Sequence, residues 1–212
     1  MPLVDFNLYL ITDRRQAPPG LTLPGAVRAA CEGGVRAVQL REKDLTAAEL
    51  FPLALELRAL TRHYGARLLI NDRIDVALAV GADGVHLGGH SLPTAAARKI
   101  LGPERLIGVS AHSLEDIAAA SRDGADFVTF GPVYFTPSKA AYGKPAGLEL
   151  LGAACDASPL PVFALGGIGP ERVGAVLDAG ASGVALISAI LARPEPAAAA
   201  RAFISLLEKM ER

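Results

Sequence analysis

The 212-residue sequence predicts an α/β protein folded as a single (β/α)8 TIM barrel, with residues 1–212 forming one domain. Two observations predict this fold. A motif with a leading glycine and an apolar, strand-like run occurs four times, beginning at Gly34, Gly81, Gly124 and Gly180. Eight apolar runs in total alternate with helical patterns along the chain. Eight βα units in about 200 residues are typical of a small barrel.

The strands are predicted from short apolar runs. Most of these runs are continuous rather than alternating, as expected for parallel strands that are covered on both faces. The glycine that begins each of the four repeats suits the end of a helix, where a positive φ is needed. The predicted strands are Leu8–Thr12, Ala37–Arg41, Arg67–Asn71, Gly84–Leu87, Leu106–Ser110, Phe127–Gly131, Val162–Gly166 and Gly183–Ile187.

The helices are predicted from apolar residues at helical spacing and from end signals. Ser113 and Asp116 form the pattern of a capping box. A doubly wound open sheet is the alternative fold, but no G-x-G-x-x-G motif follows the first strand. The one long loop, Val133–Ala146, is expected to be functional. The predicted helices are Ala47–Tyr64, Ile74–Val80, Thr94–Leu101, Leu114–Arg122, Pro170–Ala179 and Pro196–Glu211.

Composition excludes several classes of protein. Hydrophobic residues make up 51% and charged residues 20%, which excludes a disordered chain. A net charge of −1 gives no reason to expect nucleic acid or an anionic membrane as partner. Cys31 and Cys155 predict free thiols in a reducing compartment. With neither a signal peptide nor a membrane span in the sequence, we expect a soluble cytoplasmic protein, and a homo-oligomer is among the states left open.

Active sites of such barrels lie at the carboxyl ends of the strands. After the seventh strand, Gly166 and Gly167 allow close approach of the backbone to an anion. After the eighth, Ile187 and Ser188 begin a short helix whose N–H groups are free. These loops predict a phosphate site, and the alternative is that the two glycines merely make a tight turn.

A second anion site is predicted at the second and third strands. Gln39, Arg41 and Lys43 alternate along a strand, so their side chains should point the same way. A guanidinium and an ammonium suit a polyanion, and Lys139 in the long loop is expected to join them. The alternative is that Arg41 and Lys43 form salt bridges with the acids beside them, Glu42 and Asp44.

Asn71 and Asp72 lie at the end of the third predicted strand. Asn71 offers an amide to hydrogen-bond the ring of a substrate, and Asp72 offers a carboxylate to hold Mg²⁺. Asp72 is also suited to cap the helix that follows, and the two roles can coexist. Of the four histidines, His86 is expected inside the barrel in a polar layer, and His112 in a loop near the mouth. Their spacing suggests no triad or metal cage, so no catalytic histidine is predicted.

These motifs resemble the family of thiamine phosphate synthases and TenI-like proteins. The resemblance runs from Leu8 to Ile190, nearly the whole chain. The segments that carry it are Val38–Lys43, Ile70–Arg73, Gly84–Gly88, Gly131–Val133 with Thr136–Lys139, and Ala164–Ile168.

The resemblance implies a transferase of thiamine biosynthesis. Such an enzyme joins hydroxymethylpyrimidine diphosphate to thiazole phosphate and releases diphosphate in the presence of Mg²⁺. The resemblance also implies a role for each matching residue. Gln39 and Asn71 would orient the pyrimidine diphosphate, Asp72 would hold Mg²⁺, and Ser110 would contact the pyrimidine. Arg41, Lys43 and Lys139 would stabilise the leaving diphosphate. Thr136 and Ser138 would contact the thiazole, and Gly167, Ile187 and Ser188 would hold its phosphate.

Two positions bear on which subgroup the chain resembles. Ser91 stands where, by the resemblance, the synthases carry a second Mg²⁺ carboxylate, and this difference favours the TenI-like proteins. Pro132 stands where the TenI-type tautomerase has a histidine, and here the chain follows the synthases. A synthase is therefore the main prediction. The alternatives are a TenI-like thiazole phosphate tautomerase and a non-catalytic regulator that binds thiazole or thiamine phosphate.

Overall fold

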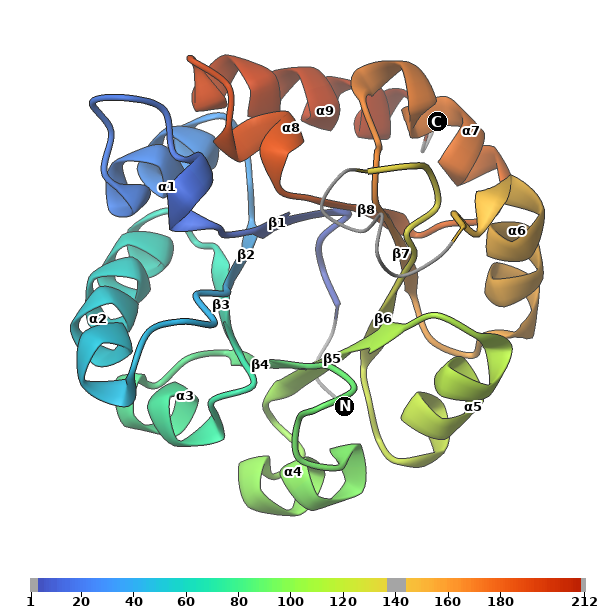
Figure 1. Cartoon of the computed structure of the whole chain (residues 1–212), viewed down its shortest axis with the longest axis horizontal. Coiled ribbons are helices and arrows are strands. Elements are labelled where there is room, and N and C mark those ends of the chain that lie inside the picture. Colours follow the sequence, from blue (N-terminus) through green and yellow to red (C-terminus); the bar gives the residue numbers. More distant parts are fainter. Residues whose placement is uncertain (1–3, 137–143, 211–212) are drawn as a thin grey trace.

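The computed structural model describes residues 4–136 and 144–210 of the chain. Eight parallel strands form a closed barrel in sequence order, with the helices around its outside, and the predicted fold class is confirmed (Figure 1). The strands are β1 (Leu8–Ile11), β2 (Ala37–Leu40), β3 (Arg67–Asn71), β4 (Gly84–Leu87), β5 (Leu106–Ala111), β6 (Phe127–Phe130), β7 (Val162–Leu165) and β8 (Gly183–Leu186).

Helices connect successive strands, and two of them lie outside the predicted set, α1 and α6. The predicted helix over residues 170–179 is divided into a 3-10 turn, η3 (Pro170–Arg172), and α7. Another 3-10 turn, η1 (Arg14–Gln16), follows β1. The α-helices are α1 (Leu23–Glu32), α2 (Ala47–His63), α3 (Ile74–Val80), α4 (Thr94–Leu101), α5 (Leu114–Arg122), α6 (Gly147–Ala157), α7 (Val173–Asp178), α8 (Ser188–Leu191) and α9 (Pro196–Met210).

Five strands end one residue earlier than predicted, whereas β5 extends one residue further. The next residue in each of these five cases lies outside the strand. Gly166, for example, has a φ of +102°, which leaves the extended conformation. Thr12 still donates its N–H to the carbonyl of Gln39 at 2.9 Å, so it lies at the margin of the sheet.

The repeated glycines have the conformation that the sequence predicts. Gly34, Gly81, Gly124 and Gly180 all have positive φ, between +62° and +106°. Each therefore turns the chain from a helix back toward the barrel, in a region of φ that side chains rarely adopt. The capping box of Ser113 and Asp116 at the start of α5 is also confirmed.

A polar side chain two residues after three of these glycines secures the sheet. The carboxylate of Asp83 accepts a hydrogen bond from the N–H of Leu68 at 2.7 Å, and that of Asp126 accepts one from Ile107 at 2.7 Å. The hydroxyl of Ser182 accepts a hydrogen bond from the N–H of Val162 at 3.3 Å. The repeat thus satisfies an N–H group at the start of the preceding strand.

Two apolar cores hold the barrel. The larger lies between the strands and the surrounding helices. The smaller fills the barrel itself and is dominated by the rings of Tyr9, Phe127 and Phe163, which contact one another edge to face. Phe6 packs on all three rings and belongs to the segment that leads into β1.

The two cysteines are free thiols, as predicted, with Cys31 buried and Cys155 half-buried. Among the described residues, no helix has the length and apolar character needed to cross a membrane.

Candidate functional site

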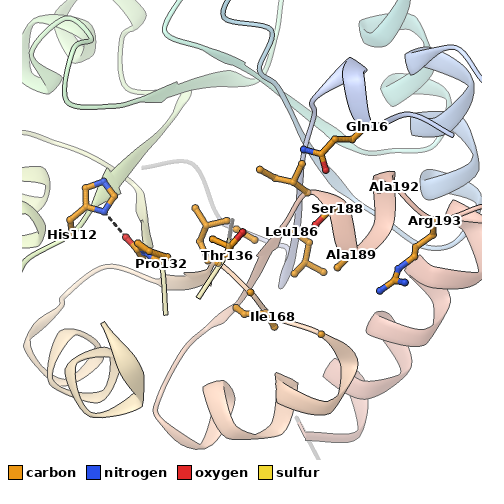
Figure 2. Close-up of a pocket in the computed structure, with 17 residues that line it drawn as sticks. Gln16, His112, Pro132, Thr136, Ile168, Leu186, Ser188, Ala189, Ala192 and Arg193 are labelled. Carbon is orange, nitrogen blue, oxygen red and sulfur yellow. Dashed lines mark hydrogen bonds between the residues drawn. The ribbon is translucent and has the colours of Figure 1, made fainter. Parts of the chain in front are cut away.

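A cavity of about 560 Å³ opens at the carboxyl ends of the strands, between the loops that follow β6, β7 and β8 (Figure 2). Loops from opposite ends of the sequence line it, because closing the barrel brings β8 beside β1. The lining residues are Gln16, His112, Gly131, Pro132, Thr136, Leu165 to Gly169, Ala185 to Ala189, Ala192 and Arg193.

The turn after β7 is built so that only glycine fits at its centre. Gly167 has a φ of +65°, and a Cβ atom there would lie 2.6 Å from the carbonyl oxygen of Phe135. Arg172 donates a hydrogen bond to the carbonyl of Gly167, and its guanidinium lies 4.4 Å from the ring centre of Tyr134. Arg172 therefore ties the turn after β7 to the loop after β6. This close packing leaves the backbone of Gly167 facing the cavity.

Four of the residues predicted to bind thiazole phosphate line this same cavity: Thr136, Gly167, Ile187 and Ser188. Ile187 precedes α8, and Ser188 is the first residue of that helix. The structure thus brings the loops after β6, β7 and β8 together around one space. Ser138 and Lys139, the other predicted residues of the long loop, lie outside the described residues.

Arg41, Lys43 and Asp72 form a charged group on another side of the mouth. The positive charge of Arg41 lowers the pKa of Lys43, partial burial lowers it further, and the carboxylate of Asp72 acts in the opposite direction. Arg41 is half-buried and Lys43 is exposed. Neither cation forms an ion pair with any residue in the described part of the chain.

The acids beside Arg41 and Lys43 pair with an arginine that follows another strand. The alternative that they form salt bridges with Arg41 and Lys43 is therefore wrong. Glu42 and Asp44 both bind the guanidinium of Arg14, at 3.1 Å and 2.6 Å respectively. Glu42 also accepts a hydrogen bond from the hydroxyl of Thr12 at 2.7 Å. The charges of Arg41 and Lys43 therefore remain available to an anion.

Gln39 is the one member of the predicted set Gln39, Arg41 and Lys43 that lies within a strand. It belongs to β2, which ends at Leu40, and its side chain is buried in the barrel, where its Nε2 atom donates a hydrogen bond to the Tyr9 hydroxyl at 3.1 Å. Arg41 and Lys43 follow the end of β2 at Leu40.

His86 connects this interior group to Ser110. As predicted, it is buried in a polar layer, with the Tyr9 hydroxyl 3.4 Å from its Nδ1 atom and Ser110 Oγ 3.0 Å from its Nε2 atom. Burial, with a contribution from the charge of Arg41, lowers the pKa of His86 to about 3. The ring is therefore neutral at pH 7.

Three hydroxyl groups surround the imidazole of His86. The Tyr9 hydroxyl, which accepts from Gln39, lies 3.4 Å from its Nδ1 atom. Ser110 Oγ and Thr129 Oγ1 lie 3.0 Å and 3.4 Å from its Nε2 atom. The neutral ring therefore holds Ser110 in place at the top of the barrel interior.

Asp72 provides one carboxylate at the mouth. It is exposed, has a φ of +64°, and forms no ion pair with any described residue. The residue that caps α3 is Arg73, without a side-chain hydrogen bond, so the alternative of Asp72 as helix cap is wrong. Across the described residues, no group of three His, Cys, Asp or Glu side chains is placed to hold a metal ion.

Ser91 stabilises a tight turn after β4. Its Oγ atom accepts a hydrogen bond from the N–H of Gly88 at 2.8 Å, and its own N–H donates to the Gly88 carbonyl at 3.0 Å. The residue directly before helix α4 is Pro93, so Ser91 does not cap that helix.

Three polar residues of the cavity carry no predicted role. Gln16 follows β1, where its Nε2 atom donates to Asp13 at 2.7 Å, and Arg193 follows α8. His112 was expected near the mouth, and its Nδ1 atom lies against the carbonyl of Gly131 (Figure 2). A polar residue close after a predicted strand end is a signal that could have found Gln16 and His112. Arg193 has no such signal.

Comparison with known proteins gives one consistent result. A family model described as thiamine monophosphate synthase matches residues 8–190. A putative thiamine-phosphate synthase of Geobacter sulfurreducens is 59% identical over 207 residues, which cover 98% of this chain and 97% of that protein. A thiamine-phosphate synthase of Moorella thermoacetica is 45% identical, with 95% and 94% covered. The solved structure of a thiamine phosphate pyrophosphorylase from Pyrococcus furiosus has a TM-score of 0.87 at 38% identity, with 96% of each chain covered.

Proposed function

The chain belongs to the thiamine monophosphate synthase family, and we propose that it joins hydroxymethylpyrimidine diphosphate to thiazole phosphate with release of diphosphate. The observation that best supports this reaction is the division of the barrel mouth into two parts. One part is a cavity closed by the loops after β6, β7 and β8. The other is the group of Arg41, Lys43 and Asp72. A reaction that joins two phosphorylated substrates needs a place for each.

In this proposal, the thiazole phosphate occupies the cavity. Gly167, Ile187 and Ser188 hold its phosphate, and Thr136 contacts the ring, with Ser138 as a second contact on the strength of the family resemblance. Gly167 permits the close approach of a phosphate because a side chain at this position would collide with the loop after β6. The ring nitrogen then faces the centre of the barrel mouth.

The pyrimidine diphosphate lies over the centre and toward β2 and β3. Gln39 and Asn71 orient it, and the hydroxyl of Ser110, held by His86 at 3.0 Å, contacts the pyrimidine. The bond between the pyrimidine methylene carbon and the diphosphate oxygen breaks, and the thiazole nitrogen forms a new bond to that carbon. Arg41, Lys43 and Lys139 stabilise the negative charge that grows on the departing diphosphate.

The residues present fit a Mg²⁺ ion that arrives together with the diphosphate. Mg²⁺ keeps several waters and takes one or two carboxylates along with substrate phosphates. Asp72 offers one unpaired carboxylate at the mouth, close enough to Lys43 to influence its pKa. When bound, the ion would neutralise charge on the leaving group.

The non-catalytic and tautomerase alternatives are less well supported. Pro132 lines the cavity where the tautomerase resemblance would need a histidine, and the relatives above carry the name of the synthase. The free thiols of Cys31 and Cys155 suit a reducing cytoplasmic location.

The test is a reaction of the purified full-length chain with both substrates, with and without Mg²⁺. We expect thiamine phosphate and diphosphate in equal amounts, only when Mg²⁺ and both substrates are present. Binding of thiazole phosphate without any product would instead favour the regulator, and isomerisation of the thiazole alone would favour the tautomerase.

A further inference from the structure

The cavity holds one permanent charge among the described residues that line it, that of Arg193. His112 is the other titratable side chain there, and its Nδ1 atom lies against a backbone carbonyl. Every other lining residue is neutral. A phosphate ester in this cavity would therefore meet one fixed positive side chain.

Arg193 lies beyond the end of α8, and its N–H bonds to the carbonyl of Ile190 at 3.2 Å. In Figure 2 its side chain extends toward Ala189 at one side of the cavity. The residue is exposed, and its guanidinium forms no hydrogen bond or ion pair within the described parts of the chain. Arg14 and Arg98, in contrast, are each tied to a carboxylate at 2.6 Å.

We propose that Arg193 binds the phosphate of the thiazole substrate and makes the enzyme prefer the phosphorylated thiazole over the unphosphorylated alcohol. The inference rests on the proposed function, since it assigns a specificity residue to the same cavity. A phosphate monoester carries a charge of about −1.5 to −2 at pH 7, which neutral groups compensate only in part. The planar fork of an arginine supplies both charge and paired donors to such a group.

The nature of the reaction predicts which kinetic constant depends on Arg193. The phosphate of the thiazole is unchanged when the new carbon–nitrogen bond forms, so its contacts are the same before and during the reaction. An interaction of this kind lowers KM and leaves kcat unaltered. Arg193 should thus differ from Arg41, which we place beside the departing group.

The experiment is titration calorimetry of the full-length chain with thiazole phosphate and with the thiazole alcohol, in wild type and three variants. Arg193→Gln removes the charge, and Arg193→Lys retains it. The matched control is Arg201→Gln, which removes an exposed arginine of α9 outside the cavity lining. These exposed substitutions should leave folding intact.

We expect Arg193→Gln to weaken binding of thiazole phosphate about tenfold and binding of the alcohol less than twofold. Arg193→Lys should recover most of the loss, and Arg201→Gln should bind as wild type does. In the complete reaction, Arg193→Gln should raise KM for thiazole phosphate by the same factor at unchanged kcat.

Equal affinity of wild type and Arg193→Gln for thiazole phosphate overturns the assignment, and so does an equal loss of affinity for the alcohol. Failure of the proposed function has a different signature: wild type then yields no thiamine phosphate, while the calorimetric difference at Arg193 persists. A wild type that binds no thiazole phosphate overturns both.

Discussion

The carboxylate of Glu42 is bound to Arg14, which precedes it by 28 residues and follows a different strand. Both carboxylate oxygens accept from the Arg14 N–H, at 3.0 Å and 3.1 Å, and one also accepts from its guanidinium at 3.1 Å. Yet Glu42 stands between Arg41 and Lys43 in the sequence. Because Glu42 binds Arg14, it connects the loop after β1 to the loop after β2. Arg41 and Lys43 are therefore not paired with this carboxylate.

The first prediction compares two acids that bind the same arginine. Glu42→Ala should lower the free energy of unfolding by about 2–3 kcal/mol, because it leaves the buried hydroxyl of Thr12 and the half-buried N–H of Arg14 without their acceptor. The Glu42 side chain is 2% exposed, whereas that of Asp44 is 42% exposed. Asp44→Ala should therefore change stability much less, since exposed ion pairs contribute little. Urea denaturation measures the free energy of unfolding of both variants. Equal losses in Glu42→Ala and Asp44→Ala would contradict the explanation that burial makes the difference.

The second prediction concerns the leaving group. Arg41→Ala should lower kcat by about 10²–10³-fold, the usual effect of removing one contact to charge that develops in a transition state. The KM for thiazole phosphate should change little. Lys139→Ala should behave in the same way if the family resemblance holds for the long loop. Steady-state kinetics measure both constants, and Arg28→Ala, an exposed change on α1, is the control. An unchanged kcat in Arg41→Ala would exclude the role.

Local signals explain why the strands and most helices could be predicted. A continuous apolar run predicts a buried parallel strand wherever it occurs, and the glycines at positions 81 and 124 were needed for a positive φ. The helix α1 was missed because Pro24 and Gly25 resemble a loop, although proline is well tolerated in a first turn. The helix α6 was missed because Gly152 interrupts its pattern.

The sequence predicted only those parts of the candidate site that lie directly at the ends of strands. Closing the barrel brings those ends together, so the sequence predicted that Gly167, Ile187 and Ser188 would be neighbours. The partner of Glu42 and the position of Arg193 depend on how loops fold back over the mouth. Nothing in the local sequence determines such contacts, because they form between segments distant in the chain.

The third prediction is a pH dependence of stability caused by His86. Its pKa is about 3 in the folded protein and 6.5 in an unfolded chain. Below pH 6.5 the unfolded state binds a proton that the folded state does not, so stability falls as the pH decreases toward 3. From pH 8 to pH 5 this one group should remove about 2 kcal/mol from the free energy of unfolding.

Urea titrations at several pH values can isolate this contribution. The His86→Gln variant should be less stable at pH 8, yet it should lose about 2 kcal/mol less than wild type between pH 8 and pH 5. His63→Gln, an exposed change at the end of α2, should keep the wild-type dependence. If all three proteins show the same pH dependence, His86 is not held neutral by the fold.

The last prediction concerns Ser91 and the binding of Mg²⁺. Asp72 supplies a single carboxylate, and no metal-binding group of three acids, histidines or cysteines occurs among the described residues. A serine hydroxyl is a neutral and weaker ligand than a carboxylate for a hard cation. The free protein should therefore bind Mg²⁺ poorly, and the ion should arrive mainly as its diphosphate complex.

Ser91→Asp would place a charged oxygen at the position where the family resemblance implies a second metal carboxylate. The substitution should tighten Mg²⁺ binding and raise the rate about tenfold, or ~1–2 kcal/mol. An aspartate can still accept the hydrogen bond that Gly88 now donates to Ser91 at 2.8 Å, so the turn after β4 should be preserved. The Mg²⁺ affinity and the turnover rate of Ser91→Asp are compared with those of wild type. Ser91→Asn is the control, because asparagine has the size of aspartate without its charge. If Ser91→Asp folds normally and neither quantity rises above its value in Ser91→Asn, this position is not part of a metal site.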